Sequence, residues 1–353
     1  MKLKKLRQKI DALDKNIIKL LNSRAKITMD IGKVKIQSGK SIYSPERESQ
    51  VLKKLAQFTK GPLKRGALES IYREIMSAGL ALEKRTVVAY MGPEASFSNL
   101  AALKKFGTQV QYLACNNIAD VFLEVERGSA DYGVVPVENS IEGAVSHTLD
   151  IFAESNLKIC SQVILDVSHN LLSNCPANMI KRVYSHPQVF GQCRIWLQEH
   201  LACAELIDVS STTRAVEIAA KEKNCAAIAS LLASRVYGLK VFALHIEDSP
   251  HNITRFFVIG KHDPLRTGMD RTSVLFSIKD KVGALYDMLM PFKRYGINLT
   301  KIESRPSKKK AWEYYFFIDL CGHQFDTKVK KALSALDKKC VFMKILGSYP
   351  VGE

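Results

Sequence analysis

Residues Tyr132–Gly143 read YGVVPVENSIEG, an apolar run that ends in a cluster of polar side chains. The run Tyr132–Val137 is short and rich in valine, so it predicts a buried strand. Runs of this kind alternate with helical patterns from residue 86 to about 265, which predicts an α/β fold. The other expected strands are Thr86–Met91, Val110–Leu113, Ala204–Val209, Ala226–Ala229 and Phe256–Gly260, and the expected helices are Leu100–Phe106, Ala119–Arg127, Val189–His200 and Thr213–Lys223.

The chain before residue 86 has a different pattern, which predicts helices only. Apolar residues recur at helical spacing from Leu3 to Leu21. Ser44-Pro45-Glu46 is typical of a helix start, and Gly61-Pro62 is typical of a break. We therefore expect three helices, over about residues 3–39, 45–58 and 63–85.

The first of these helices is unusually long. About 35 residues at a rise of ~1.5 Å each make a rod of roughly 50 Å. The two shorter helices cannot cover such a rod, so a single copy of the chain would leave apolar surface exposed. We therefore expect two copies to intertwine, as a homodimer or a higher homo-oligomer.

Residues 272 to 349 form a third pattern, in which a strand and a helix are followed by two strands, a helix and a strand. This βαββαβ order is ferredoxin-like, and Asp263–Asp270 is expected to link it to the α/β zone. The predicted elements are Thr272–Lys279, Gly283–Tyr295, Leu299–Ser304, Tyr314–Leu320, Thr327–Lys339 and Val341–Leu346. We expect a multidomain protein with domains over residues 1–85, 86–265 and 272–353.

The composition excludes several classes of protein. Hydrophobic residues make up 46% and charged residues 25% of the 353 residues, close to the average of soluble globular proteins. No apolar run approaches the ~18 residues that span a bilayer, and the basic N-terminus leads into no apolar signal core. Neither a membrane partner nor secretion by that route is expected.

The net charge of +17 comes from 52 Lys and Arg against 35 Asp and Glu. These charges are spread along the whole chain, which is typical of a solvated surface. A basic DNA-binding regulator is the alternative, but neither a recognition helix nor an interleaving of aromatic and basic residues supports it. We expect no nucleic-acid partner.

The eight cysteines include no C-x-x-C pair, and no histidine pair has metal-ligand spacing. Free thiols in a reducing cytoplasm are therefore expected. We expect no metal and no other cofactor.

Four cations stand among the predicted helices, namely Arg7, Arg24, Lys35 and Arg47. Arg24 and Lys35 are three full turns apart, so they share one helix face about 16 Å apart along the axis. Arg7 lies roughly 42 Å from Lys35 on the same rod, so it cannot reach the same small ligand within its own chain. An antiparallel second copy could supply it.

The sequence around these cations resembles the all-helical chorismate mutases, in the segments Leu6–Asp14, Arg24, Gly32–Lys35 and Glu46–Glu48. The resemblance implies that Arg7 of one copy, with Arg24 and Arg47 of the other, binds the two carboxylates of chorismate. It implies that Lys35 donates to the ether oxygen, which gains negative charge as its bond breaks. It also implies that Glu48 accepts a hydrogen bond from the ring hydroxyl.

Glu83 departs from the family pattern. The second donor to the ether oxygen is a glutamine in some members, and Glu83 stands at that position here. A glutamate can donate only when it is protonated, so this role makes the reaction depend on the proton of Glu83. Ser44 and Gly79 stand where some members carry an aspartate and a serine, and we give neither a role.

Four segments of the α/β zone resemble prephenate dehydratases: Tyr132–Gly143, Ser185–Cys193, Ser211-Thr212 with Ala215, and Asn252–Phe257. This family has two α/β lobes around a cleft, similar to type II periplasmic binding proteins. Prephenate loses CO2 and its ring hydroxyl together, and formation of the aromatic ring drives the reaction. The resemblance makes Thr254 the catalytic residue, as a hydrogen-bond donor or relay to the leaving oxygen.

The same resemblance implies further ligand donors, which are Asn139, Ser140, Ser211 and Thr212. Arg255 has two interpretations, because it can bind a substrate carboxylate or form a structural ion pair between the lobes. For His186, a capping role in the Ser-His-Pro-Gln turn is favoured over a role as catalytic acid.

Two segments of the third zone resemble the ACT regulatory domain of these dehydratases, which binds phenylalanine between two subunits. They are Gly283-Ala284-Leu285, at a helix start, and Glu303-Ser304-Arg305-Pro306, at a strand end. The resemblance implies that the backbone at Gly283 admits the ligand and that Leu285 contacts its ring.

Together the three resemblances imply a bifunctional chorismate mutase and prephenate dehydratase, an isomerase and a carbon–oxygen lyase of phenylalanine biosynthesis under phenylalanine feedback. Its ligands would be chorismate, prephenate and phenylalanine. One alternative is a monofunctional dehydratase whose helical domain serves only dimerisation. The other is an amino-acid-sensing binding protein without catalysis, which intact Thr254-Arg255-Phe256 and the helical cations argue against.

Overall fold

The structure is a computed structural model of the chain, and it describes residues 2–58, 61–279, 281–307 and 314–351. The chain divides into two compact units. The first comprises Met1–Val87 with Lys105–Gln111, and the second comprises Val88–Lys104 with Tyr112–Glu353. Among the described helices, none is long and apolar enough to cross a membrane.

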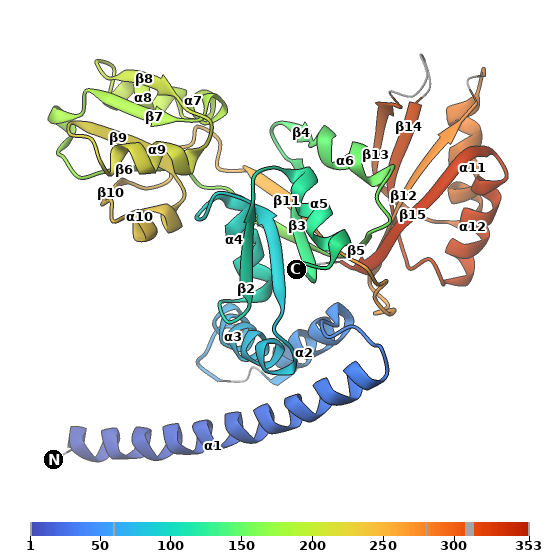
Figure 1. The fold of residues 1–353 in the computed structure, drawn as a ribbon, viewed down its shortest axis with the longest axis horizontal. Helices are drawn as coiled ribbons and strands as arrows, with labels where there is room; N and C mark the ends of the chain where they lie inside the picture. The colour runs from blue at the N-terminus through green and yellow to red at the C-terminus, as the bar shows by residue number, and fades with distance from the viewer. Residues whose placement is uncertain (1, 59–60, 280, 308–313, 352–353) are drawn as a thin grey trace. The chain divides into compact units, whose positions relative to one another are not determined.

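The first unit holds the three helices that the apolar spacing predicts: α1 (Lys2–Gln37), α2 (Pro45–Phe58) and α3 (Arg65–Glu83). Figure 1 shows α1 as a long rod with α2 and α3 beside its C-terminal half only. A glycine allows the close approach of α1 to α3, because a Cβ at Gly32 would lie 2.9 Å from the Cα of Glu83. Residues 2–23 of α1 are all exposed, Leu13 and Leu20 among them.

The second unit contains three sheets, of which the first has the order β2-β1-β3-β11-β5, with β4 paired to β3. β1 runs parallel to β3, whereas β11 runs antiparallel to both β3 and β5. The register of β11 on β3 sets Thr254 opposite Asn139. The bounds are β1 (Val87–Met91), β2 (Gln111–Cys115), β3 (Tyr132–Asn139), β4 (Gly143–Ala144), β5 (Lys158–Asp166), β11 (Ile253–Gly260), α4 (Phe97–Phe106), α5 (Ile118–Arg127) and α6 (Ser146–Phe152).

The second sheet has the order β10-β6-β9-β7-β8. The chain passes from the first sheet to the second after β5 and returns before β11. These two crossovers lie side by side, because the Val167 amide donates to the Asn252 carbonyl at 2.8 Å and the Ile246 amide to the His169 carbonyl at 2.9 Å. The bounds are β6 (Asn170–Ser173), β7 (Arg182–Ser185), β8 (Glu205–Asp208), β9 (Cys225–Ala229), β10 (Val241–Ala243), α7 (Pro187–Gln192), α8 (Arg194–His200), α9 (Thr212–Ala219), α10 (Leu231–Tyr237) and a 3₁₀ turn over Ala177–Met179.

One expected helix, Val189–His200, is two helices that break at Cys193. The break has a distant cause, because the carboxylate of Asp248 accepts hydrogen bonds from the backbone amides of Ile195 and Trp196 at the start of α8. A side chain more than fifty positions away thus replaces the carbonyls that a continuous helix would offer.

The third sheet has the order β13-β14-β12-β15 and carries α11 and α12, in the predicted βαββαβ order. A core of Phe276, Met288 and Leu333 joins the helices to the sheet. β15 also approaches the first sheet closely, since a Cβ at Gly347 would clash with the carbonyl oxygen of Ile159. The bounds are β12 (Asp270–Ile278), α11 (Ala284–Tyr295), β13 (Leu299–Pro306), β14 (Tyr314–Cys321), α12 (Thr327–Asp337) and β15 (Cys340–Pro350).

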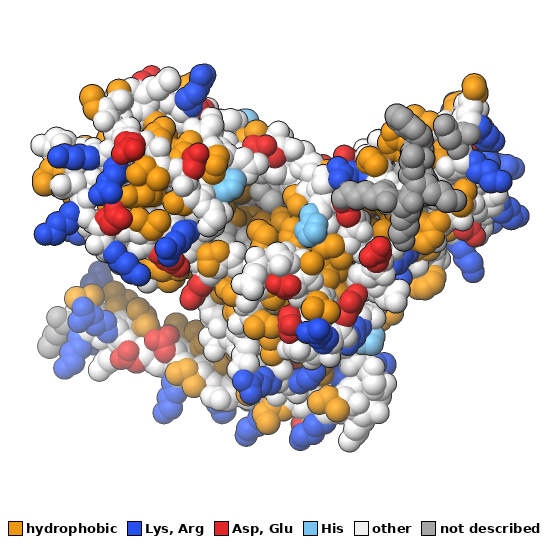
Figure 2. Space-filling model, turned by 45° about the horizontal axis from the view of Figure 1, so that its top comes forward, with side chains coloured by type: hydrophobic (Ala, Val, Ile, Leu, Met, Phe, Trp, Pro, Cys, Tyr) orange, Lys and Arg blue, Asp and Glu red, His pale blue; other side chains and the backbone are white. Residues whose placement is uncertain are grey.

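Lys and Arg side chains are scattered among acidic ones over the face drawn in Figure 2. This distribution is that of a solvated surface, as expected from the spread of charge along the sequence.

Candidate active sites

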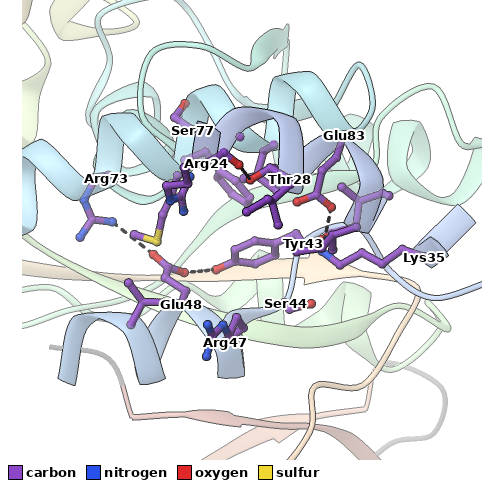
Figure 3. Close-up of a pocket in the computed structure, with 18 of the residues that line it drawn as sticks. Arg24, Thr28, Lys35, Tyr43, Ser44, Arg47, Glu48, Arg73, Ser77 and Glu83 are labelled. Atoms are coloured by element: carbon purple, nitrogen blue, oxygen red, sulfur yellow. Dashed lines mark hydrogen bonds and ion pairs between the residues drawn. The ribbon is translucent and has the colours of Figure 1, made fainter. Parts of the chain in front are cut away.

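A cavity of about 550 Å³ opens in the first unit. Its walls come from the C-terminal half of α1, the start of α2, the C-terminal half of α3 and the residues Lys105 and Phe106. Figure 3 shows polar side chains of α1, α2 and α3 around it. Arg24, Lys35, Arg47, Glu48 and Glu83, which the sequence nominates for one site, all line this cavity.

Lys35 and Glu83 form an ion pair in the cavity, with 2.8 Å between Nζ and Oε2. Lys35 Nζ also donates to the carbonyl of Ile42 at 2.6 Å, and both charged side chains are largely buried. The missing Cβ of Gly32 lets α3 carry Glu83 to this position. Without substrate, therefore, Glu83 accepts from Lys35 and does not act as a donor.

Glu48 is buried and has three partners on its carboxylate. Tyr43 donates its hydroxyl at 2.7 Å, Lys105 Nζ lies at 2.8 Å, and Arg73 lies at 3.5 Å. The Lys105 ammonium also lies 5.9 Å from the centre of the Tyr43 ring. Glu48 is thus held as an acceptor beside two cations. The sequence interpretation missed Tyr43, Arg73 and Lys105, which lie in none of the family segments.

The remaining cations differ in position. Arg24 donates to the Ile75 carbonyl at 3.4 Å, and a Cβ at Gly79 would lie 3.6 Å from its guanidinium. Position 79 thus borders the arginine at ordinary contact distance. Arg47 lies at the exposed rim of the cavity, and Arg7 lies on the uncovered part of α1, away from it. Arg7 does not reach the cavity of its own chain, as the rod geometry predicts.

In the second unit, the ends of β3 and β11 bring Asn139 and Thr254 together. Asn139 Nδ2 donates to Thr254 Oγ1 at 2.8 Å, and Thr254 is 9% exposed. The side-chain oxygen Oδ1 of Asn139 accepts hydrogen bonds from the backbone amides of Ile141 and Glu142, and these bonds hold the side chain in place. A nearly buried threonine hydroxyl therefore has a fixed partner.

The other expected ligand donors have local structural partners. Ser140 Oγ donates to the His251 carbonyl at 2.8 Å and accepts from the Ile253 amide, so it ties the returning crossover to β3. Ser211 caps α9 through the Arg214 amide, and Thr212 is the first residue of that helix. His186 caps α7 by accepting from the Gln188 amide, which is the favoured one of its two interpretations.

Arg255 forms a structural ion pair in this structure, and its role in binding a substrate carboxylate stays a prediction. Its guanidinium donates to Gln162, Asp319 and Tyr349 at 2.9, 2.5 and 2.9 Å. Successive residues of a strand face opposite sides, so Arg255 points away from the side occupied by Thr254. The ion pair is structural, but it joins β11 to β14 of the third sheet and not one lobe to the other.

The residues nominated for phenylalanine lie around the third sheet. Gly283 has φ +79° at the start of α11, a conformation that favours glycine, and Leu285 is 51% exposed. Ala284 follows as the first residue of α11. Glu303, Ser304, Arg305 and Pro306 end β13, where Arg305 lies 3.7 Å from Asp150 of α6.

Neither metal nor thiol chemistry stands out. Within the described ranges, no group of three His, Cys, Asp or Glu side chains is placed to hold a metal ion. Burial raises the pKa of Cys115 and of Cys340 to about 11, with nearby carboxylates adding to the effect. These two thiols therefore stay protonated at neutral pH.

Three family models match consecutive parts of the chain. They are chorismate mutase type II over residues 6–84, prephenate dehydratase over 88–264 and the ACT domain over 272–338. Lys105, which lines the cavity of the first unit, falls within the part matched by the dehydratase model.

Two relatives align over nearly the whole chain, and both are named bifunctional chorismate mutase/prephenate dehydratase. The protein of Aquifex aeolicus is 49% identical over 99% of this chain and 98% of its own length. That of Stutzerimonas stutzeri is 45% identical over 99% and 97%. A prephenate dehydratase from Arthrobacter aurescens, solved in complex with L-Phe, covers 75% of this chain and 90% of its own, with 33% identity and a TM-score of 0.71. The chain belongs to the family of bifunctional chorismate mutase/prephenate dehydratases.

Proposed function

We propose that the chain catalyses two successive reactions, chorismate to prephenate and prephenate to phenylpyruvate with CO2 and water, and that phenylalanine inhibits it. One observation carries the proposal. The cavity with Arg24, Lys35 and Glu83 and the buried Asn139–Thr254 pair occur in one chain that aligns end to end with bifunctional relatives.

In the mutase reaction the ether C–O bond breaks while a C–C bond forms within the same molecule. The enzyme therefore needs only to orient the substrate and to stabilise the charge that develops on it. Arg24, Arg47 and Arg7 of a second copy bind the two carboxylates. Lys35 and a protonated Glu83 hold the ether oxygen between them, so substrate replaces the present ion pair with two hydrogen bonds. Glu48, fixed by its cations, accepts from the ring hydroxyl.

In the dehydratase reaction the ring carboxylate leaves as CO2, its electron pair enters the ring, and the hydroxyl leaves with its own pair. A proton must join the leaving hydroxyl to give water. Thr254 donates a hydrogen bond to that oxygen, and Asn139 positions Thr254. Ser140 and Ser211 contribute indirectly, because their hydrogen bonds fix the backbone near His251 and at the start of α9.

Phenylalanine binds at Gly283–Leu285 and Glu303–Pro306. Contacts between β13, β14 and the first sheet provide a route for inhibition. Lys301 pairs with Glu138 at 2.9 Å and Asp319 with Arg255 at 2.5 Å. Glu138 and Arg255 are the neighbours of Asn139 and Thr254, so a ligand that moves the third sheet moves the catalytic pair.

Four further assignments belong to this proposal. The chain forms an intertwined homodimer or higher homo-oligomer through α1, since residues 2–23 are uncovered in one copy. Its domains span residues 1–85, 86–265 and 272–353. The first two sheets of the second unit act as lobes that close on prephenate, in the manner of type II periplasmic binding proteins. The location is cytoplasmic, in keeping with eight cysteines that are not paired in disulfides.

The test is to supply chorismate to the purified protein and to follow chorismate, prephenate and phenylpyruvate separately, with and without phenylalanine. Lys35→Ala should abolish most mutase turnover and leave dehydratase turnover, and Thr254→Val should do the reverse. Loss of both activities in either folded variant would refute the two-site assignment. Mutase failure alone in the unaltered protein would favour a monofunctional dehydratase.

A further inference from the structure

The Asn139–Thr254 pair is the end of a longer chain of side-chain hydrogen bonds. Asn139 Nδ2 donates to Asn252 Oδ1 at 2.7 Å as well as to Thr254. Asn252 Nδ2 then faces Gln192 Oε1 at 3.0 Å, and Gln192 Oε1 faces His169 Nε2 at 2.8 Å. The series runs from β11 along both crossovers between the first two sheets, and it ends at a residue with no assigned role.

The direction of these bonds is set at Asn139. Its Oδ1 accepts from the backbone amides of Ile141 and Glu142 at 2.9 and 3.0 Å, and a backbone amide can only donate. The side-chain amide cannot be turned over without facing two donors with its NH2 group. Both hydrogens of Nδ2 are therefore directed at Asn252 and Thr254.

The same reasoning passes along the series. Asn252 presents its oxygen to Asn139, so its NH2 group faces Gln192, which presents its own oxygen in turn. Glu142 supports this orientation independently, because its carboxylate accepts from Gln192 Nε2 at 3.3 Å. Gln192 Oε1 thus faces His169 as an acceptor, and His169 must carry its hydrogen on Nε2.

The surroundings of His169 suit this neutral tautomer. The ring is 2% exposed, and burial lowers its pKa below the ordinary value of 6.5, against the opposite effects of Gln192 and Glu247. Its Nδ1 has no hydrogen-bond partner among the described residues, as fits a nitrogen that carries no hydrogen. The Phe97 ring packs edge-on at 5.6 Å.

We propose that His169 and Asn252 are positioning residues of the dehydratase. The backbone amides at Asn139 set the direction of the series, and His169 and Asn252 complete its hydrogen bonds, so that Asn139 is held where Thr254 Oγ1 accepts from it. The hydroxyl hydrogen of Thr254 then has no role within the series and is available to the leaving oxygen of the substrate. If the series ran in the opposite direction, the Thr254 hydroxyl would donate its hydrogen to Asn139. The inference rests on the proposed dehydratase function, and it adds the residues that hold Asn139 and, through it, the Thr254 hydroxyl in place.

The test compares two variants of His169 in the full chain. His169→Phe keeps an aromatic ring and removes the donor, whereas His169→Gln keeps an N–H at similar reach. We expect His169→Phe to lower dehydratase kcat about tenfold or more with little change in KM, and His169→Gln to recover most of the loss. Mutase turnover in the same preparation is the internal control for folding. Equal kcat in both variants, whether high or low, would overturn the proposal.

A spectroscopic measurement covers the case in which His169→Phe does not fold. The nitrogen chemical shifts of the imidazole in the unaltered protein should identify the Nε2–H tautomer. An Nδ1–H tautomer or a charged ring at neutral pH would overturn the assigned direction. This readout needs no substrate, so absence of prephenate turnover would refute the proposed function and leave the tautomer as a separate result.

Discussion

At the scale of single residues, Lys35 and Glu83 carry the most direct prediction. Their ion pair holds Glu83 as an acceptor, whereas the reaction needs a second donor at the ether oxygen. Glu83→Gln supplies a permanent donor of nearly the same shape, so its mutase kcat/KM should equal or exceed that of the unaltered enzyme. The measurement is chorismate consumption by both proteins under the same conditions.

Glu83→Ala is the matched control, because it frees Lys35 without supplying a donor. It should be slower than both other proteins. If Glu83→Gln were as slow as Glu83→Ala, another residue would be the second donor.

Lys105 makes a second residue-scale prediction. Its ammonium is one of two cations on the buried carboxylate of Glu48. Lys105→Met should leave Glu48 less well paired and lower mutase kcat/KM by about tenfold, ~1.4 kcal/mol of transition-state stabilisation. Lys105→Arg, which keeps the charge, should lose much less. Turnover of chorismate is measured, and turnover of prephenate by the same samples should stay unchanged. A loss shared by both reactions would point to unfolding near Phe106.

The two groups of site residues explain what sequence can predict at this scale. Lys35, Glu83, Asn139 and Thr254 stand within short family segments and could be nominated from them. Lys105 reaches Glu48 across 57 positions, through the packing of the Lys105–Gln111 segment on the helices. No pattern of nearby residues in the sequence predicts the contact between Lys105 and Glu48.

At the scale of elements, α1 gives a prediction about assembly. Ile10 and Ile17 lie on one face of its uncovered part and are 56% and 52% exposed. Replacing both with Glu should place charge in the contact with a second copy and produce monomers. Mutase turnover should then fall more than tenfold, since Arg7 of the second copy is lost, while dehydratase turnover persists. Sedimentation and the two assays measure these effects.

Lys5→Glu with Lys19→Glu is the control, because these residues lie on the side of α1 away from Ile10 and Ile17. It lowers the net charge twice as much as the two isoleucine substitutions do and should still leave assembly intact. A monomeric unaltered protein with full mutase activity would contradict both the dimer and the role of Arg7.

The elements also differ in how well their sequences predict them. The helices of the first unit and the six elements of the third sheet follow clear apolar periods, and their bounds were predicted closely. Several elements were missed, because runs such as Asn170–Ser173 are buried by distant neighbours and carry little periodicity of their own. The missed elements are β4, β5, β6, β7, β10, α6 and α10. The break at Cys193 depends on Asp248, which sequence does not place beside it.

At the scale of the whole molecule, regulation separates into binding and coupling. Gly283 has φ +79°, and no atom of the described residues lies within 4 Å of the place where a Cβ would stand. A side chain at this position would therefore strain the backbone and obstruct a ligand that approaches it. Gly283→Val should remove phenylalanine binding by calorimetry and remove inhibition, with little change in uninhibited turnover. Retained binding would move the ligand site elsewhere.

Coupling should be lost without loss of binding when a contact between the third and the first sheet is cut. Lys301 is the better target, because its side chain is 6% exposed and its partner Glu138 is 37% exposed. Removing this lysine leaves Glu138 access to water, whereas removing Asp319 would strand the buried Arg255. Lys301→Met should still bind phenylalanine, yet the same ligand should inhibit prephenate turnover several-fold less. Lys328→Met, an exposed position on α12, is the control and should behave like the unaltered protein. If Lys301→Met were inhibited as strongly as that control, the coupling would depend on another contact between the two sheets. The ion pair of Arg305 with Asp150 would be the next contact to remove.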